Sequence, residues 1–302
     1  MSNEKSSTST NINWYPGHMA KTKRQILEDL KLIDVIVEVL DARIPISSQN
    51  PDIKEYSQNK KRVVVLNKSD LADETETNKW IKYFKEKEIP AISVDCNSGK
   101  GVNEVIRTIK EVAKENQEKF SSKGRVGKSI RIMILGIPNV GKSTFINKIT
   151  NRKAAQVGNK PGVTRQKQWV KVDNEIELMD TPGILWPKFE SQTVGMNLAF
   201  TGTIKDDILE KTEIAFELLK FLLNQYRANV VERYKLETSE IEEILSNENS
   251  YENDNYLEIL NAIAKKRGEI LSGGRIDYEK ISGILLDEFR SGKLGRITIE
   301  RK

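Results

Sequence analysis

The sequence predicts an α/β domain, in which helices cover both faces of a mostly parallel sheet, followed by an all-helical C-terminal domain. Up to about residue 204, Val- and Ile-rich runs alternate with amphipathic stretches, which is typical of βαβ units. Beyond that point, stretches of helical period follow one another without an intervening strand. We therefore expect a polar, disordered tail over residues 1–12, the α/β domain over residues 13–204 and the helical domain over residues 205–302.

The strands of the α/β domain are predicted from apolar runs. Four runs are short and β-branched enough to be buried strands, namely residues 33–40, 62–66, 90–94 and 130–135. Residues 77–88 and 102–120 lie between them and have helical period. The stretches QWVKVD and EIELMD, on either side of Asn174, predict a two-stranded hairpin added to the sheet. The Gly-, Ser- and Lys-rich residues 121–129 are expected to form a loop.

The C-terminal domain is predicted from four stretches of helical period, residues 208–223, 239–245, 256–268 and 277–292. The first carries a dense apolar set that is expected to form core, because nothing at that spacing carries chemistry. This set is Ile208, Leu209, Ile214, Phe216, Leu218, Leu219, Phe221 and Leu222. A basic tail, GKLGRITIERK, occupies residues 292–302.

Charge and cysteine content narrow the classes of function. The net charge is +5, but residues 237–258 hold eight acidic residues and no Lys or Arg, which leaves +13 elsewhere. This asymmetry favours a polyanionic partner, nucleic acid more than membrane. The single cysteine, Cys96, excludes an internal disulfide and a cysteine-rich metal site, and it fits a reducing cytosol. No run approaches the ~18 apolar residues of a membrane helix, and the N-terminus lacks the apolar centre of a secretory signal.

The strongest chemical signal is GIPNVGKS, residues 136–143, which matches the phosphate-loop pattern between a predicted strand and a predicted helix. In that setting, backbone amides close around a β-phosphate at the positive end of the helix. Lys142 is expected to neutralise β- and γ-oxygens, and Ser143 is expected to offer its hydroxyl to Mg²⁺. The nucleotide contacts expected from this region are Asn139, Val140, Gly141, Lys142, Ser143 and Thr144.

Two further motifs are predicted to reach the γ-phosphate and its metal. LMDTPG places Asp180 at the end of a strand, where its carboxylate is expected to hold Mg²⁺ through water while the Gly183 amide faces the γ-phosphate. In KPGVT, Thr164 is expected to reach the metal from a mobile loop, with an ordinary loop threonine as the alternative. The predicted metal ligands are therefore Ser143, Thr164 and Asp180.

The stretch NKSD, residues 67–70, follows a predicted strand and matches the guanine-selecting element of GTPases. The two carboxylate oxygens of Asp70 suit the ring N–H and amino group of guanine and leave adenine with an unmatched edge. Asn67 is expected to tie the base edge to the phosphate loop, and the stem of Lys68 to lie across the purine plane. The next strand ends in SVD, where a base-supporting loop is expected, although only Ser93 matches the usual Ser-Ala-Lys.

NKSD precedes the phosphate loop, which reverses the usual order. The order NKSD, SVD, GIPNVGKS, PGVT, DTPG resembles that of the circularly permuted GTPases. The stretches NWYPGHMAKTKRQI and VLDARIPISSQNP are similar to the ribosome biogenesis GTPase A (RbgA/YlqF) family, and the resemblance covers residues 13 to about 200. It implies a P-loop GTPase domain whose strands are permuted in sequence while the site is unchanged in space. It also implies that the segment after DTPG can move a helical RNA-binding domain on nucleotide exchange.

The resemblance also implies an activity, which is GTP hydrolysis to GDP with Mg²⁺, stimulated by the large ribosomal subunit. Ile184 stands where many GTPases have a water-orienting glutamine, so the family pattern makes His18, the only histidine, the expected catalytic residue. Capping a helix and contacting RNA are the alternative roles of His18. Asn139 resembles the asparagine of potassium-stimulated GTPases, which makes K⁺ a candidate activator, with a loop-shaping role as the alternative.

The partners that the resemblance implies are the large ribosomal subunit and its RNA, with docking in the GTP state and release on hydrolysis. Basic residues suited to phosphate contact, with Trp169 interleaved for stacking, are Arg152, Lys153, Lys160, Arg165, Lys167 and Lys171. The tail residues Lys293, Arg296, Arg301 and Lys302 are expected to add to them, with ordinary solvated surface as the alternative. We expect a cytoplasmic protein that is monomeric when free and makes no membrane contact.

Three other functions remain as alternatives. A related permuted GTPase of the small ribosomal subunit, or of another RNA, would normally bring an OB barrel and a Cys/His zinc motif, whereas 12 residues precede Asn13 and one cysteine is present. A non-enzymatic RNA-binding scaffold would be expected to lose Lys142, Ser143 or Asp180, and all three are present. A general ATPase would lack NKSD, and comparing GTP with ATP binding discriminates it.

Overall fold

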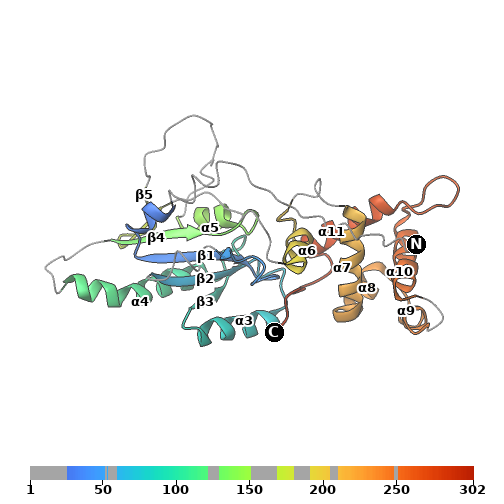
Figure 1. Ribbon diagram of the computed structural model, residues 1–302, viewed down its shortest axis with the longest axis horizontal. Coiled ribbons are helices and arrows are strands. Elements are labelled where there is room, and N and C mark those ends of the chain that lie inside the picture. The colour runs from blue at the N-terminus through green and yellow to red at the C-terminus, as the bar shows by residue number, and fades with distance from the viewer. Residues whose placement is uncertain are drawn as a thin grey trace, which may run out of the picture.

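The computed structural model describes residues 26–51, 53, 60–121, 129–150, 169–179, 191–204, 210–247 and 251–302. Figure 1 shows a lobe that contains the sheet, coloured blue to green, and a helical lobe, coloured yellow to red. Helix α6 (Gln192–Phe200) lies between them (Figure 1). The prediction of an α/β region followed by an all-helical region is confirmed.

Within the described ranges, six strands form one sheet in the order β3-β2-β1-β4-β6-β5. These are β1 (Val35–Asp41), β2 (Lys61–Asn67), β3 (Ala91–Ser93), β4 (Ile130–Leu135), β5 (Trp169–Lys171) and β6 (Ile176–Met179). The pairs β1–β2, β1–β4, β2–β3 and β4–β6 are parallel, and β5 pairs antiparallel with β6. The predicted parallel sheet with an added hairpin is therefore confirmed.

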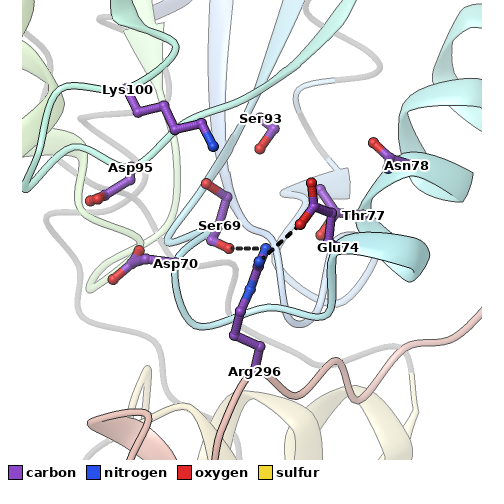
Figure 2. A pocket seen from close by; sticks show the side chains of 9 residues that line it. All are labelled: Ser69, Asp70, Glu74, Thr77, Asn78, Ser93, Asp95, Lys100 and Arg296. Carbon is purple, nitrogen blue, oxygen red and sulfur yellow. Dashed lines mark hydrogen bonds and ion pairs between the residues drawn. The ribbon is translucent and has the colours of Figure 1, made fainter.

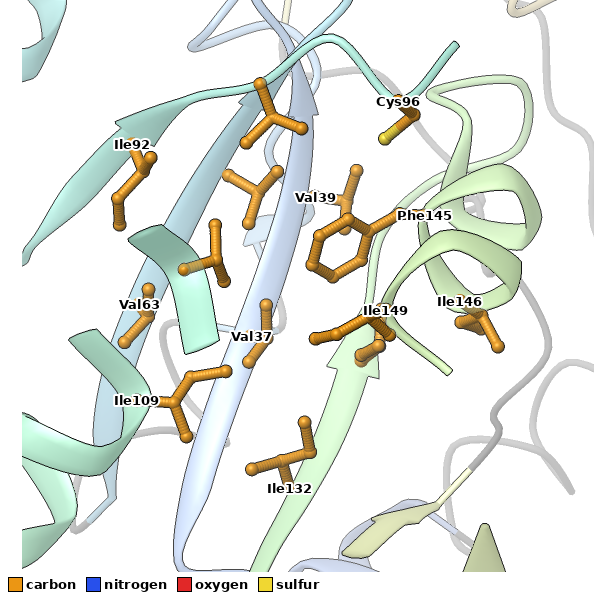
Figure 3. Packing of buried hydrophobic residues seen from close by; sticks show 14 of the residues in the cluster. Val37, Val39, Val63, Ile92, Cys96, Ile109, Ile132, Phe145, Ile146 and Ile149 are labelled. Carbon is orange, nitrogen blue, oxygen red and sulfur yellow. The ribbon is translucent and has the colours of Figure 1, made fainter. Parts of the chain in front are cut away.

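Both faces of the sheet are covered, because successive side chains of a strand point to opposite faces. On one face, the odd-numbered β1 valines pack with α4 (Val102–Ser121) and α5 (Lys142–Ile149), and Phe145 lies among them (Figure 3). On the other face, Leu40 packs against α3 (Glu74–Glu86), and Ile36 packs against the apolar residues of 26–33. The central strand is buried along its whole length, which explains its nearly continuous apolar composition.

The topology brings the polar motifs to one edge of the sheet. From β1 the chain passes to β2 and β3 on one side, and then to β4 and β6 on the other. Ligands of open α/β sheets bind outside the carboxyl ends of the strands where the strand order reverses. Asp41, Asn67 and Ser93 end β1, β2 and β3, and the GIPNVGKS loop follows β4. The candidate site therefore lies at this edge.

The helical lobe contains five helices within the described ranges. They are α7 (Lys211–Gln225), α8 (Arg227–Tyr234), α9 (Thr238–Leu245), α10 (Glu252–Arg267) and α11 (Tyr278–Arg290). Of the expected core set, Ile214, Leu218, Leu219 and Leu222 are buried, and Phe216 and Phe221 are half-buried. Ile208 and Leu209 lie outside the described residues. Helix α8 was not predicted, because it buries only Val230 and Tyr234 and so shows little apolar period.

Within the described part of the chain, two segments join the lobes. In α6, Leu198 belongs to the core of the sheet lobe, and Ala199 and Phe200 belong to the core of the helical lobe. Residues 294–302, here called the C-terminal segment, return from α11 to the sheet lobe, so the C mark in Figure 1 lies beside α3. The Ile297 N–H donates to Leu71 O at 2.9 Å, and the Ile299 N–H donates to Arg43 O at 2.9 Å. The domain boundary at residue 204 stays a prediction.

Candidate nucleotide-binding site

The GIPNVGKS loop runs from the end of β4 into α5, as the motif predicts. Asn139 and Gly141 adopt left-handed backbone angles, φ 63° and 89°, and a Cβ at Gly141 would collide with the side-chain amide of Asn67. Loops of this kind turn successive N–H groups toward one concavity, which suits an anion at a helix N-terminus. Ser143 and Thr144 are exposed in the first turn of α5, and Lys142 is half-buried. The loop therefore has the shape that a phosphate group requires.

Asn67 links the NKSD motif to the phosphate loop. Its side-chain amide donates a hydrogen bond to Val140 O at 2.7 Å. Its side-chain oxygen accepts a hydrogen bond from the Cys96 N–H, in the loop after β3, at 3.3 Å. Two motifs that are 73 positions apart therefore share a hydrogen bond. The hydrogen bond from Asn67 to the phosphate loop is therefore present, while the contact of Asn67 with the base stays a prediction.

A buried ion cluster supports Lys68. Asp41, at the end of β1, pairs with Arg43 at 2.8 Å and with the Lys68 ammonium at 3.0 Å. Burial by itself would raise the pKa of Asp41, but the charges of Arg43 and Lys68 and the hydrogen bonds from Arg43 hold that pKa well below its ordinary value. Asp41 thus stays ionised and fixes the far end of Lys68, whose stem lines the cavity beside NKSD.

A cavity of about 200 Å³ opens between NKSD, the phosphate loop and the loop after β3. Its lining includes Asn67, Lys68, Asp70, Cys96, Gly141 and Thr144. Thr201, after α6, and Arg290, at the end of α11, line it from the other side. Burial, followed by the charges of Asp95 and Asp70, raises the pKa of the Cys96 thiol to about 12, so this lining group is uncharged.

The loop after β3 departs from the expected arrangement at one position. Ser93 does not line the 200 Å³ cavity but a neighbouring one of about 180 Å³, which Asp70 and Asp95 also reach (Figure 2). Asp95 accepts hydrogen bonds from the Asn97 N–H at 2.8 Å and the Ser98 N–H at 3.3 Å. Asp95 therefore shapes this loop, and a contact of Ser93 with the base stays a prediction.

Several expected site residues lie outside the described residues. They are His18, Thr164, Asp180 and Gly183, together with Ile184. Their assignments stay predictions. Among the described residues, no cluster of His, Cys, Asp and Glu could hold a metal ion by itself.

Other residues of the site were not predicted as such. Asp41 and Arg43 occur in VLDARIP, which the sequence analysis used only as a sign of resemblance, although two charges at the end of an apolar strand are a signal in themselves. The Asn139 amide donates to Gly202 O at 2.9 Å, and Arg290 donates to Ala199 O at 2.8 Å and Phe200 O at 3.0 Å. The turn after α6 therefore contacts the phosphate loop, and the last residues of α6 contact the helical lobe.

The basic residues expected to contact RNA differ in their surroundings. Lys171 is exposed, and the Arg131 guanidinium lies 4.6 Å from the centre of the Trp169 ring, which occupies one face of that ring. Arg152, Lys153, Lys160, Arg165 and Lys167 lie outside the described residues. In the C-terminal segment, Arg296 and Arg301 bond to the sheet lobe. No described helix is both long and apolar enough to cross a membrane.

Comparison with known proteins decides the family. A family model described as "50S ribosome-binding GTPase" matches residues 131–262. The chain is 49% identical over 289 residues to ribosome biogenesis GTPase A of Bacillus cereus, covering 96% of this chain and 93% of that protein. The chain belongs to the ribosome biogenesis GTPase A family. It is also 33% identical over 293 residues to the member from Thermotoga maritima, covering 96% of this chain and 94% of that protein.

Solved structures of the family agree with the fold. GDP-bound YlqF superposes with a TM-score of 0.64 at 26% identity, covering 92% of this chain and 99% of that one. GNP-bound YlqF from T. maritima has a TM-score of 0.61 at 26% identity, covering 93% and 98%. The circularly permuted GTPase fold predicted from the motif order is thereby confirmed.

Proposed function

We propose that this GTPase of ribosome biogenesis acts on the large ribosomal subunit, binding the pre-subunit and its RNA in the GTP state and leaving on hydrolysis. The main structural support for a guanine-nucleotide site is the hydrogen bond between Asn67 and Val140 O, because it joins NKSD to the phosphate loop in space. The matching family model, whose description includes "50S ribosome-binding", supports the choice of subunit. The free protein is proposed to be monomeric and cytoplasmic.

The described residues fit a guanine nucleotide along the edge of the sheet. The base enters the 200 Å³ cavity, with Asp70 at its ring N–H and amino group and the stem of Lys68 along its plane. Phosphates meet the backbone amides around Val140 and Gly141 at the start of α5. Lys142 neutralises the β- and γ-oxygens, and Thr144 lines the cavity where the α-phosphate and ribose would lie.

The site also fits Mg²⁺. The Ser143 hydroxyl is exposed in the first turn of α5, next to the left-handed Gly141 where the phosphates are proposed to lie. Asp180 and Thr164 are proposed to complete the ligand set. When bound, the ion neutralises charge on the β- and γ-phosphate oxygens.

Hydrolysis is proposed to use His18 to orient the attacking water, because Ile184 cannot accept or donate a hydrogen bond through its side chain. The Gly183 amide is proposed to contact the γ-phosphate. K⁺ is proposed to act near Asn139, whose amide group is directed to Gly202 O and whose side-chain oxygen is left to face a cation. The turn after α6 would then sense the occupant of the phosphate site.

The test is GTP hydrolysis by the full chain in K⁺ and in Na⁺ buffer, with large subunits, small subunits or neither. Stimulation by large subunits alone, and greater in K⁺, is the expected result. Stimulation by small subunits would favour the alternative partner. His18→Ala is expected to bind GTP normally and to lose stimulated hydrolysis, and unchanged turnover would remove His18 from the mechanism.

A further inference from the structure

We propose that Arg296 is a positioning residue for guanine recognition, which fixes the backbone turn that carries Asp70. This inference rests on the proposed role of Asp70 at the base. Arg296 lies in the C-terminal segment, and none of the motifs of the GTPase domain includes that segment. Arg296 belongs to the basic tail, for which RNA contact and ordinary solvated surface were the two expectations, and in the structure it bonds to the backbone of the NKSD turn.

Arg296 brackets the NKSD turn with its guanidinium group. Its Nε donates to Ala72 O at 2.7 Å, and its Nη2 donates to Ser69 O at 3.0 Å, so the two acceptors lie on either side of Asp70 and Leu71 in the chain. Its third nitrogen, Nη1, bonds Glu74 at 3.0 Å. Figure 2 shows the side chain rising from the C-terminal segment toward Ser69 and Glu74. A rigid fork with several donors suits two backbone carbonyls better than a single ammonium would.

The neighbours of Arg296 hold the same turn. The Ile297 N–H donates to Leu71 O at 2.9 Å, and the Asp73 N–H donates to the Thr298 hydroxyl at 3.0 Å. Three carbonyl groups of residues 69–72 are therefore hydrogen-bonded by residues 296 and 297. Within the turn itself, the Leu71 N–H donates to Lys68 O at 3.0 Å.

The Asp70 side chain depends on this backbone support. It is exposed, and no interaction joins it to the other labelled residues in Figure 2. Among the described residues, none donates a hydrogen bond to its carboxylate, so only the turn positions its Cα–Cβ bond and sets the direction from which the carboxylate reaches the base. Two simultaneous hydrogen bonds to guanine require that direction to be accurate. Loss of Arg296 is therefore expected to weaken the base contacts and leave the phosphate contacts intact.

The test compares GDP with inosine diphosphate, which lacks only the 2-amino group that Asp70 is proposed to bind. In Arg296→Ala, GDP affinity is expected to fall about tenfold, and the preference for GDP over inosine diphosphate about threefold or more. The matched control is Arg301→Ala, which removes the same charge from the same segment at similar exposure, 41% against 46%. Arg301 contacts Glu76 and Gln225 instead of the turn, so its loss is expected to leave the preference unchanged.

Two further variants separate the possible failures. Arg296→Lys keeps the charge but can reach one carbonyl at a time, so an intermediate preference is expected, and this variant serves if Arg296→Ala does not fold. Asp70→Asn is expected to lose GDP and gain xanthosine diphosphate, whose 2-oxo group accepts the new N–H. Retained GDP preference in Asp70→Asn would overturn the proposed base contact itself. A second outcome would overturn only the positioning role. In it, Asp70→Asn loses its GDP preference, while the Arg296 variants either keep the preference for GDP over inosine diphosphate or lose affinity for both nucleotides equally.

Discussion

The two ends of the candidate site are built differently. At the base end, the phosphate loop bonds Asn67, the carboxylate of Asp41 pairs with Lys68, and the C-terminal segment bonds the turn that carries Asp70. At the phosphate end, the side chains of Ser143 and Thr144 are exposed, and the shape comes from left-handed backbone at Asn139 and Gly141. The proposed base contacts therefore depend on side chains from distant segments, and the proposed phosphate contacts depend mainly on the backbone geometry of one loop.

The largest expected effect is on the phosphate end. The double variant Lys142→Ala, Ser143→Ala is expected to lose GTP affinity by on the order of 10² to 10⁴, because it removes two charge-assisted contacts of about 1.5–3 kcal/mol each. The free energy of unfolding should change by less than about 1 kcal/mol, since the shape of the loop depends on its backbone conformation more than on these two side chains. Calorimetric GTP titration and urea unfolding measure the two. Lys82→Ala, on the exposed face of α3, is the control, and undiminished GTP affinity in the double variant would refute the assignment.

The next effect, on the base end, is one of stability. Asp41→Asn leaves Arg43, which is 1% exposed, as a buried cation without its carboxylate, so a loss of about 3–5 kcal/mol in the free energy of unfolding is expected. Because the folded-state pKa of Asp41 is lowered, its stabilisation is present above the unfolded pKa near 4 and is lost as the pH falls below that value. Urea unfolding at pH 7 and pH 3 should show a smaller difference between wild type and variant at pH 3.

The control for Asp41 is Asp287→Asn, which changes an exposed carboxylate in α11 and should shift stability by no more than about 0.5 kcal/mol. If Asp41→Asn were as stable as wild type at pH 7, the base end would not depend on its ion cluster. The contrast between the two ends would then rest on the C-terminal segment alone.

The smallest of the three leading effects is expected at Asn139. Asn139→Ala removes an exposed hydrogen bond to Gly202 O and places alanine at a left-handed φ of 63°, so the free energy of unfolding should fall by about 1–2 kcal/mol. Hydrolysis should become the same in K⁺ and Na⁺ buffer if the side-chain oxygen faces the cation. Asn253→Ala, an amide in α10, is the control and should keep any difference between the two cations. Persistent K⁺ stimulation in Asn139→Ala would exclude Asn139 from cation binding.

The sequence predicts the sheet well because its signals are local. Each expected strand overlaps an observed one, and among the described residues NKSD and SVD begin at strand ends and the phosphate loop follows β4. Helix α3 begins at Glu74, three residues before the expected start, because Asp73 caps it by accepting from the Thr75 and Glu76 N–H groups. The spacing of apolar residues cannot predict where such a helix begins when its first turn is polar.

The role of the C-terminal segment could not be predicted in this way. Arg296 bonds to carbonyl oxygens of Ser69 and Ala72, and a backbone acceptor has no signature in the side-chain sequence. The same holds for the Asn139 bond to Gly202 O and for the Arg290 bonds to the last carbonyl groups of α6. The bonds of Arg296 to the sheet lobe are therefore visible only in the structure, and contact of the basic tail with RNA stays a prediction.

The contacts between the C-terminal segment and the NKSD turn have a consequence for the order in which the protein matures. The bonded residues are 224 to 227 positions apart, so a ribosome translating about 5–20 residues per second makes the turn roughly 10–45 s before Arg296. The hydrogen-bond partners of the phosphate loop, Asn67 and Gly202, are by contrast both made before Arg296. In the proposed scheme, discrimination between guanine and other bases is the last property that the nascent protein acquires.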